Sequence, residues 1–358
     1  MGVCLLPLVN VKALSRERLS SFLSSIGQPD FRAAQLFAWV HGRGMRSFDD
    51  MTDLPLGLRA ELSRLAYIGC LVTRVCLASK QDGTEKYVFE LDDGELVESV
   101  ALAHEYGRSA CVASQVGCRM GCTFCASTIG GLVRNLHPWE MEDQVLAMSP
   151  SGVGGTTQSR RISSVVVMGS GEPLENLDSV CEFVERIHDP LGLGIGLRHV
   201  TVSTCGLPNR MVELAERLPQ VTLAVSLHAP NDELRSRLMP VNRRYCLSSV
   251  LEACRQCVAL TGRRISFEYA LIEGVNDGLE SASQLTELLR GLLCHVNLIP
   301  LNPVTEREYR ASSRDRVDAF RAVLASAGVP ATVRRELGRD IDAACGQLRR
   351  RAIEQHGL

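Results

Sequence analysis

Four cysteines occur within fifteen residues of the chain, in the stretch CVASQVGCRMGCTFC at 111–125. Three of them, Cys118, Cys122 and Cys125, have the spacing C-x3-C-x2-C. A closed zinc site requires four ligands, so three thiolates in one loop predict a metal centre with one open position. Thiolates at this spacing can each bind a different iron of a 4Fe–4S cluster, leaving the fourth iron free to chelate a small molecule. The alternatives are a zinc knuckle completed by a distant histidine and three cysteines buried in a core.

The composition and charge narrow the class of protein. Of the 358 residues, 45% are hydrophobic, which is enough for one large α/β domain and a smaller accessory piece. The net charge of −2 and the aromatic content of 5% do not by themselves indicate a nucleic-acid partner. The apolar start is too short for a signal peptide and no apolar run reaches transmembrane length, so we expect a cytoplasmic protein without a membrane partner. The 14 cysteines are then expected to be reduced, and the clustered ones to bind metal or carry thiol chemistry.

Two smaller units precede the cysteine loop. Residues 15–66 carry apolar side chains at helical spacing in three stretches, SRERLSSFLSSIG, DFRAAQLFAWVHGRG and DLPLGLRAELSRLA, and they predict three helices. From residue 69 to residue 103 the apolar period changes to two. The DDG between two alternating runs predicts a β-hairpin there.

After residue 108, short apolar runs alternate with helix-like segments. The runs are ACVASQV, ISSVVVMG, HVTVST, VTLAVSLHA, ISFEYALIEG and CHVNLIPLN. Continuous apolar strands separated by helices indicate a parallel sheet covered on both faces, and six such units predict a partial (βα)6 TIM-like barrel. Chemistry in such barrels lies at the carboxyl ends of the strands. The polar residues that follow these runs should therefore meet at one rim: Cys118 to Cys125, Gly169 to Pro173, Ser203 to Gly206, Ser226 to His228, and Asn302. The Gly, Ser and Thr content of residues 149–161 predicts a mobile surface connection.

These segments together resemble a known family. The C-x3-C-x-Φ-C pattern, with Phe124 as the aromatic residue, resembles the signature of the radical S-adenosylmethionine (SAM) enzymes. The chain is further similar, from about residue 31 to residue 349, to the adenine-C2 methyltransferases that act on 23S ribosomal RNA and on transfer RNA. The matching stretches are FRAAQLFAWVHGRG, KYVFELDDGELVESV, CVASQVGCRMGCTFCAS, MGSGEPLEN, SLHAPNDELRSRLMPVN, NLIPLNPV and DIDAACGQLR. One departure is Ser170, where the family usually has methionine.

The resemblance implies the cofactors and the residues that bind them. A 4Fe–4S cluster would be bound by Cys118, Cys122 and Cys125, and two molecules of SAM would be used in each turnover. The methionine end of SAM would lie on the glycine-rich turn in MGSGEP. The residues implied to contact SAM are Gly171, Glu172, Ser203, Ser226, Leu227, His228 and Asn302.

Three catalytic residues are also implied by the resemblance. C2 of adenine is an electron-poor carbon that does not attack a sulfonium, so its methylation requires radical chemistry. Cys345 would take a methyl group from one SAM, and a 5′-deoxyadenosyl radical from a second SAM would activate that methyl for addition to C2. Cys111 would attack the sulfur of Cys345, forming a disulfide and releasing the base. Glu98 would accept the C2 proton, with Cys111 as the alternative acceptor. Without the resemblance to the family, we would expect Cys345 to be a small buried apolar side chain and Glu98 to be a carboxylate on the surface of a strand.

We expect four segments: an N-terminal helical RNA-binding unit over 1–68, a β-hairpin linker carrying Glu98 over 69–103, a radical SAM barrel over 104–348, and a short basic tail over 349–358. The expected partners of a monomeric chain are 23S ribosomal RNA, transfer RNA and a reducing flavoprotein that donates electrons. Candidate cations for RNA phosphates are Arg119, Arg134, Arg243, Arg244, Arg334, Arg335 and Arg349 to Arg351.

Other functions stay open at this point. The nearest alternative is the adenine-C8 methyltransferase of the drug-resistance branch, whose mechanism also uses one cysteine to carry the methyl group and a second to release the product. The second is radical chemistry on a different substrate, and the third is a non-catalytic RNA-binding module stapled by zinc. Cys254 and Cys257 also form a C-x2-C pair, but they lie on one face of a predicted helix and are expected in the core.

Overall fold

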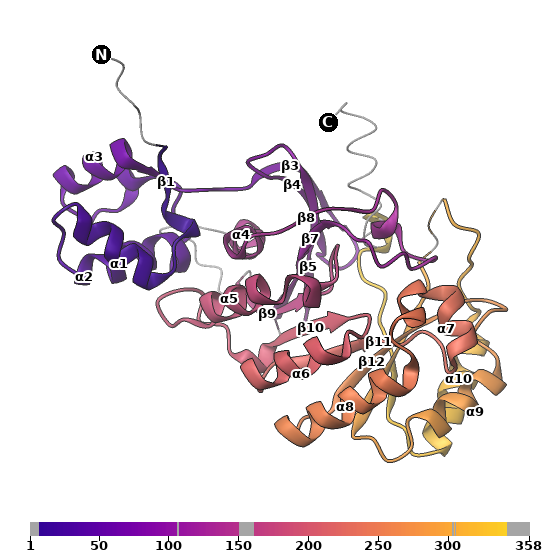
Figure 1. The fold of residues 1–358 in the computed structure, drawn as a ribbon. Helices are drawn as coiled ribbons and strands as arrows, with labels where there is room; N and C mark the ends of the chain where they lie inside the picture. The colour runs from indigo at the N-terminus through magenta and orange to yellow at the C-terminus, as the bar shows by residue number, and fades with distance from the viewer. Residues whose placement is uncertain (1–6, 106, 150–160, 303, 305, 342–358) are drawn as a thin grey trace.

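The computed structural model of the chain describes residues 7–105, 107–149, 161–302, 304 and 306–341 (Figure 1). The connection expected at 149–161 lies, apart from its two end residues, outside the described residues, as does Cys345. Within the described ranges, no helix is long and apolar enough to cross a membrane.

The N-terminal unit forms the three predicted helices around a core of its own. They are α1 (Arg16–Ser25), α2 (Phe31–Phe37) and α3 (Leu56–Leu65). α2 continues into a π-helical turn, η2 (Ala38–Gly42), and short 3-10 turns form at η1 (Val11–Ala13) and η3 (Phe48–Asp50). β1 (Val9–Asn10) pairs in parallel with β2 (Ala66–Tyr67), which joins the two ends of the unit.

Buried charges attach this unit to the rest of the molecule. Lys12 forms a fully buried ion pair with Asp143 of helix α4 (Pro138–Met148). His41, in the π-helical turn, contacts the carboxylate of Glu142 at 2.8 Å, and both side chains are buried. Arg186 of helix α5 (Leu177–His188) donates to the carbonyl oxygen of Lys12 at 2.7 Å. Removal of the unit would leave the buried carboxylate of Asp143 without its ion-pair partner, at a high free-energy cost, whereas Glu142 would keep Arg186 at 4.0 Å.

The main sheet has ten strands in the order β14-β13-β12-β11-β10-β9-β6-β5-β4-β3. From β6 to β14 neighbouring strands are parallel, and from β3 to β6 they are antiparallel. The strands are β3 (Val72–Ala78), β4 (Glu85–Glu90), β5 (Leu96–His104), β6 (Gly107–Cys111), β9 (Ile162–Val167), β10 (Val200–Thr204), β11 (Thr222–Ser226), β12 (Ile265–Leu271), β13 (Cys294–Pro300) and β14 (Ala331–Val333). The partial (βα) barrel expected from the sequence is therefore present.

Three details of the sheet differ from the sequence expectation. The hairpin at 69–103 is a three-stranded extension of the barrel sheet rather than a separate linker, because β5 pairs with β6. The first barrel strand ends at Cys111, and residues 115–117 form a separate strand, β7 (Gln115–Gly117), which pairs with β8 (Leu132–Asn135). The short strand β14 follows the six expected strands and was not predicted.

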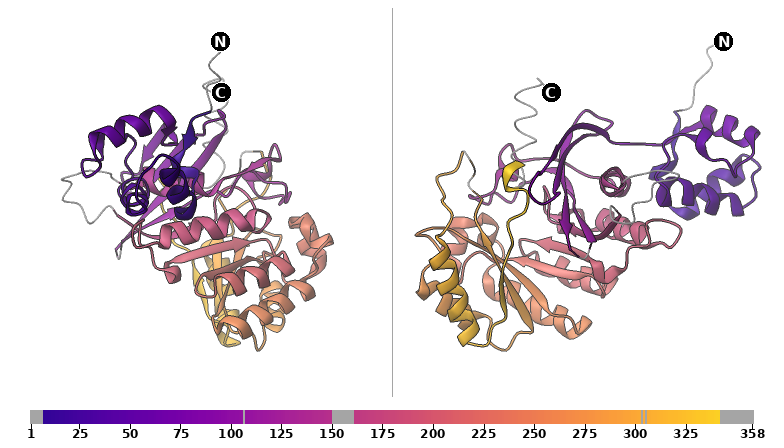
Figure 2. Two further views of the ribbon diagram at one scale, coloured as in Figure 1. Left: turned by 60° about the vertical axis from the view of Figure 1, so that its left-hand side comes forward. Right: turned by 180° about the vertical axis from the view of Figure 1, so that it is seen from behind.

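The helices cover one face of the sheet, and the N-terminal unit lies at the opposite end of the molecule from α8, α9 and α10 (Figures 1 and 2). The remaining helices are α6 (Pro208–Arg217), α7 (Asp232–Leu238), α8 (Leu247–Thr261), α9 (Leu279–Leu288) and α10 (Arg314–Ser326). Apolar residues at alternate positions of the strands pack against the helices in one core, for example Val165 and Val167 of β9 and Phe267 and Tyr269 of β12. Since the helices cover this face alone, the expectation of a sheet covered on both faces is wrong, and the other face is free to line a site.

Candidate active site

The cysteine loop runs from the end of β7 to a 3-10 turn, η4 (Ala126–Thr128), and hydrogen bonds at several points fix its backbone. The N–H of Cys118 donates to the carbonyl of Gly131 at 2.9 Å, and the N–H of Thr123 donates to the carbonyl of Leu238 at 2.9 Å. The hydroxyl of Thr128 donates to the carbonyls of Cys122 at 3.1 Å and Cys125 at 2.9 Å. The conformation of the loop is thus set by the protein itself.

The donor set of this loop is three cysteines, the residue type that binds iron–sulfur clusters. In the part of the chain that the structure describes, no three His, Cys, Asp or Glu side chains converge on a point where one ion could bind. A cluster does not need such a point, since each cysteine binds a different iron. Burial raises the pKa of the Cys118 thiol to about 12, and burial also raises the pKa of Cys122. Because the thiolate is the ligand, the binding of iron at these buried sites must displace protons.

The glycine-rich turn after β9 lies directly against the strand end before the cysteine loop. Gly171 has φ +110°, and a Cβ there would come within 2.6 Å of the Gln115 side chain. A Cβ on Gly169 would come within 2.7 Å of the backbone of residues 112 and 113. The N–H of Glu172 donates to Gln115 Oε1 at 2.8 Å, and the hydroxyl of Ser170 donates to the Gly117 carbonyl at 3.2 Å. The glycines therefore permit a close backbone approach, and Ser170, the departure from the family pattern, supports the turn.

Glu172 connects this turn to the next strand end. Its carboxylate accepts the N–H of Cys205, just after β10, at 2.7 Å and the N–H of Leu174 at 3.0 Å. The side chain is buried, and this burial raises the pKa of its carboxyl group. Glu172 thus holds the ends of β9 and β10 in a fixed relation.

His228 follows β11 in a backbone conformation that side chains rarely adopt. Its φ is 56°, the one positive φ of a non-glycine residue in the described chain. Nδ1 accepts the N–H of Ala270 at 2.9 Å, so Nε2 carries the proton of the neutral ring. Asn276 stabilises the turn by donating to the carbonyls of His228 at 2.8 Å and Ala270 at 2.6 Å. Phe124 of the cysteine loop packs edge-on against the His228 ring at 4.9 Å, which joins the loop to the end of β11.

Arg235 is a site residue that the sequence analysis missed. It is fully buried on α7 and donates to the carbonyl of Cys205 at 2.6 Å, to Asn242 Oδ1 at 2.8 Å and to the carbonyl of Leu227 at 3.2 Å. A further bond reaches the carbonyl of Ser226 at 3.2 Å. One guanidinium therefore holds the ends of β10 and β11 together. An arginine within the matching stretch NDELRSRLMPVN was the available signal, but its burial could not be inferred from the stretch.

The register of the strands places the other predicted residues on the face opposite the helices. Ser203 of β10 pairs with Ala224 of β11, and Ser226 pairs with Glu268 of β12, which pairs with Asn297 of β13. Residues paired in register point to the same face of a sheet. Glu268 is only 4% exposed, and its Oε2 has no hydrogen-bond partner among the described residues. A glutamate inside the apolar run ISFEYAL is the sequence signal that could have identified it.

The antiparallel extension places Glu98 and Cys111 on this same face. Glu98 pairs in register with Val88 of β4, and its neighbour Val100 pairs with Cys111 of β6. Cys111 in turn pairs with Val166 of β9, on the side away from the helix core. Glu98 is buried in an ion pair with Lys86, at 2.9 Å. The structure therefore brings two of the three predicted catalytic residues together on one face.

The remaining predicted residues are placed as follows. Leu227 is fully buried, and its N–H and carbonyl bond with the Glu268 carbonyl and with Arg235. Asn302 lies exposed after β13. Cys345 lies outside the described residues. The segment that leads to it is anchored at Asp340, which accepts from the Ser79 hydroxyl at 2.7 Å, in the turn between β3 and β4.

The candidate arginines differ in their freedom to contact RNA. Arg134 is engaged in ion pairs with Asp93 and Glu140, so its main role is structural. Arg119 is exposed but pairs with Glu175. Four others have exposed side chains: Arg243, Arg244, Arg334 and Arg335. The arginines at 349–351 lie outside the described residues.

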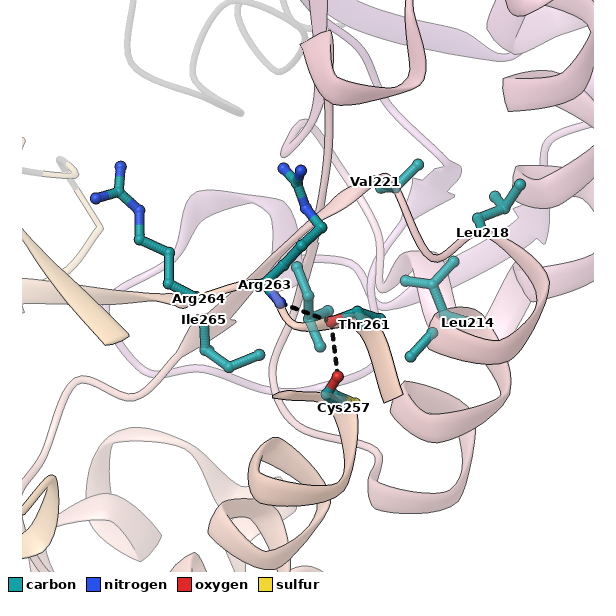
Figure 3. Close-up of a pocket in the computed structure, with 10 residues that line it drawn as sticks. Leu214, Leu218, Val221, Cys257, Thr261, Arg263, Arg264 and Ile265 are labelled. Atoms are coloured by element: carbon teal, nitrogen blue, oxygen red, sulfur yellow. Dashed lines mark hydrogen bonds between the residues drawn. The ribbon is translucent and has the colours of Figure 1, made fainter. Parts of the chain in front are cut away.

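A small pocket on the helix side is separate from this site (Figure 3). It lies between α6, α8 and the starts of β11 and β12, and its lining includes Leu214, Leu218, Cys257 and Arg263. Its volume of about 20 Å³ has room for roughly one water molecule. Both Cys254 and Cys257 are buried in the core, as predicted from their helical spacing.

Comparison with known proteins adds evidence of a different kind. Residues 9–68 match the family described as the ribosomal RNA large subunit methyltransferase N-terminal domain, and residues 112–285 match the radical SAM superfamily. The chain is 52% identical over 343 residues to a protein of Desulforamulus reducens named "Probable dual-specificity RNA methyltransferase RlmN", covering 96% of each chain. It is also 52% identical over 344 residues to the protein of the same name from Symbiobacterium thermophilum, covering 96% of this chain and 92% of that protein. A crystal structure of a radical SAM methyltransferase from Sphaerobacter thermophilus superimposes with a TM-score of 0.89 at 42% identity, covering 95% of this chain and 99% of the other.

Proposed function

Because the chain belongs to the RlmN family of dual-specificity RNA methyltransferases, within the radical SAM superfamily, we propose that it methylates C2 of an adenosine in 23S ribosomal RNA and in transfer RNA. Membership of the radical SAM superfamily implies a 4Fe–4S cluster and SAM as cofactors. The observation that carries the proposal is the convergence on one face of the sheet: Glu98 and Cys111 share it with Ser203 and Ser226.

The chain's own residues would hold these cofactors at the rim of the barrel. Cys118, Cys122 and Cys125 would bind the cluster, which when bound supplies the electron that cleaves SAM. The turn with Gly171 and Glu172 would receive the methionine end of SAM, as membership of the radical SAM superfamily implies. The contacts proposed for Ser203, Ser226, Leu227, His228 and Asn302 would position the rest of SAM. Two SAM molecules would be used in each turnover.

Cysteine chemistry then accounts for the methyl transfer. Cys345 would take a methyl group from SAM by displacement, forming an S–CH3 bond and releasing S-adenosylhomocysteine. After one hydrogen atom is removed from that methyl, its carbon would add to C2. Loss of the C2 proton and of one electron, for which the iron–sulfur cluster would be the acceptor, would leave the RNA tied to Cys345 through a CH2 group. The thiolate of Cys111 would attack the sulfur of Cys345. The S–S bond forms as the S–CH2 bond breaks, and the departing electron pair takes up a proton to leave a methyl group on the base.

Glu98 would accept the proton from C2. It lies on the strand next to Cys111, two positions from the residue that pairs with it. Its carboxylate forms a buried ion pair with Lys86, at 2.9 Å, which holds the side chain in place on this face of the sheet. This geometry supports Glu98 over a role for Cys111 in both steps.

The N-terminal unit would contribute to RNA binding, and a reducing flavoprotein would supply electrons to a monomeric enzyme. The target base must be unpaired or flipped from its stack to reach the site. Deletion of residues 1–66 is not a clean test of the N-terminal role, because Glu142 and Asp143 would lose their buried partners.

The test is anaerobic reconstitution with iron and sulfide, followed by reaction with an RNA fragment, SAM and a chemical reductant. We expect 2-methyladenosine in the nuclease digest by mass spectrometry. The Cys345→Ala variant should make none, and Cys111→Ala should accumulate a covalent complex of RNA and protein. A product of 8-methyladenosine, or full turnover by Cys345→Ala, would contradict the proposal.

A further inference from the structure

Lys86 is one of three lysines in the chain, and it is fully buried beside Glu98. Its Nζ lies 2.9 Å from Glu98 Oε1, and the two side chains are 0% and 5% exposed. Burial of a lysine is costly unless its charge is paired. The pair therefore occupies a place in the protein where either charge alone would be strongly unfavourable.

The strand register shows which other groups share this location. Lys86 of β4, Val100 of β5 and Cys111 of β6 form one row across three strands. Because neighbouring strands lie about 4.8 Å apart, this row spans roughly 10 Å. Glu98 lies two residues from Val100 on β5, on the same face. Lys86 therefore lies on the same face as Glu98 and Cys111, the two residues of this region that the proposed reaction uses.

We propose that Lys86 is a positioning residue of the methyl-transfer reaction, which keeps Glu98 ionised and oriented so that it can take the C2 proton. This inference rests on the role of Glu98 in the proposed function. A buried carboxyl group without a cationic partner takes up a proton, and a protonated carboxyl group cannot act as a base. We expect the loss of Lys86 to affect the proton-transfer step rather than cofactor cleavage, because Lys86 contacts Glu98 and Glu98 has no proposed role in that cleavage.

The other charged groups near this face lie next to residues other than Glu98. Arg334, which is exposed after β14, lies near Glu268 of β12, and Arg334 and Arg335 lie near His104. Glu90 of β4 pairs with Arg74 at one end of the face. His104 of β5 shares a hydrogen bond with the Ser109 hydroxyl, at 2.8 Å, near the other end. Cys111 carries no positive charge. Among the described groups on this face, Lys86 is the cation that pairs with Glu98.

The experiment compares Lys86→Met with Lys80→Met, a matched change of an exposed lysine in the turn before β4. Each protein is reconstituted anaerobically, and iron content, 5′-deoxyadenosine release and released methylated RNA are measured between pH 6.5 and pH 9.5. We expect Lys86→Met to keep the first two but to release at least tenfold less methylated RNA at pH 7, with recovery of about tenfold for each pH unit above it. A pH profile of the same shape as that of Lys80→Met would overturn the inference.

A double-mutant cycle separates this inference from the proposed role of Glu98. Glu98→Gln alone should lower product release by about 100-fold, as expected for loss of a general base. Adding Lys86→Met to Glu98→Gln should then cause no further loss, because the lysine acts through the carboxylate. Losses that multiply in full would overturn the role of Lys86, whereas full turnover by Glu98→Gln would overturn the proposed role of Glu98 itself.

A second variant covers the case in which Lys86→Met does not fold. Lys86→Arg keeps the positive charge, so its pH profile should follow that of Lys80→Met. If Lys86→Arg folds with normal iron content and yet shows an alkaline-shifted profile, the charge is not what matters, and the inference fails.

Discussion

Replacement of Arg235 by methionine tests whether one buried guanidinium holds the two strand ends of the site together. Methionine has a similar length and no charge, so the variant removes the hydrogen bonds while keeping much of the packing. Bonds to the carbonyls of Cys205 and Leu227 and to Asn242 Oδ1 would be lost. Each bond from a charged donor is worth about 1.5–3 kcal/mol.

The free energy lost with these hydrogen bonds is partly offset, because methionine avoids the cost of burying a cation. The same burial lowers the pKa of Arg235. Each buried carbonyl or amide oxygen left without its donor costs about 1–3 kcal/mol, and after this offset we expect a net loss of stability of about 3–5 kcal/mol. With a urea slope of about 3 kcal/mol/M for a chain of this size, the midpoint of unfolding should fall by roughly 1–1.7 M.

The assay is urea unfolding followed by circular dichroism, with Arg237→Met as the control. Arg237 lies on the same helix and is exposed, so its loss should change stability by less than about 0.5 kcal/mol. Arg235→Met should also release less 5′-deoxyadenosine, because Ser226 and Leu227 lose an anchor of their backbone. Equal midpoints for the two variants would refute the reasoning.

Three further outcomes are expected. Gly171→Ala should bind SAM poorly and lose about 1–3 kcal/mol of unfolding free energy, because Gly171 has a φ of +110° and a Cβ there would meet Gln115 at 2.6 Å. Equilibrium dialysis measures the SAM affinity, and wild-type affinity would contradict the prediction. Asn276→Ala should loosen the turn at His228, because it removes the 2.8 Å hydrogen bond to the His228 carbonyl, and should therefore lower the yield of 5′-deoxyadenosine. Asn231→Ala, which removes an exposed helix cap, should leave that yield unchanged. Equal yields from the two variants would contradict the prediction. Burial and the nearby Arg235 lower the pKa of His228 to about 3, below the value of about 6.5 in the unfolded chain, so its contribution to stability is complete above about pH 6.5 and falls by about 1.4 kcal/mol per unit as the pH drops toward 3. In urea unfolding, the free energy of unfolding of His228→Asn should therefore fall less between pH 7 and pH 5 than that of the wild type. An equal fall in the two proteins would contradict the lowered pKa of His228.

The sequence by itself determined the elements whose signals are local. The cysteine spacing, the glycines of the turn after β9 and the apolar runs are each contained within a few residues, so they predicted the loop, the turn and the parallel strands. Helical periodicity likewise predicted the three N-terminal helices and the buried position of Cys254 and Cys257.

Only the tertiary structure decided which distant residues meet. Lys12 and Asp143 are 131 positions apart, and Arg235 is 30 positions from the carbonyl of Cys205 that it bonds. The alternation in β4 and β5 predicted a hairpin, but the pairing of β5 with β6 makes it part of the barrel sheet and brings Glu98 and Lys86 to the face of Cys111. Strand register and helix docking are set by the whole core, and a buried charge is stable only where that core supplies its partner.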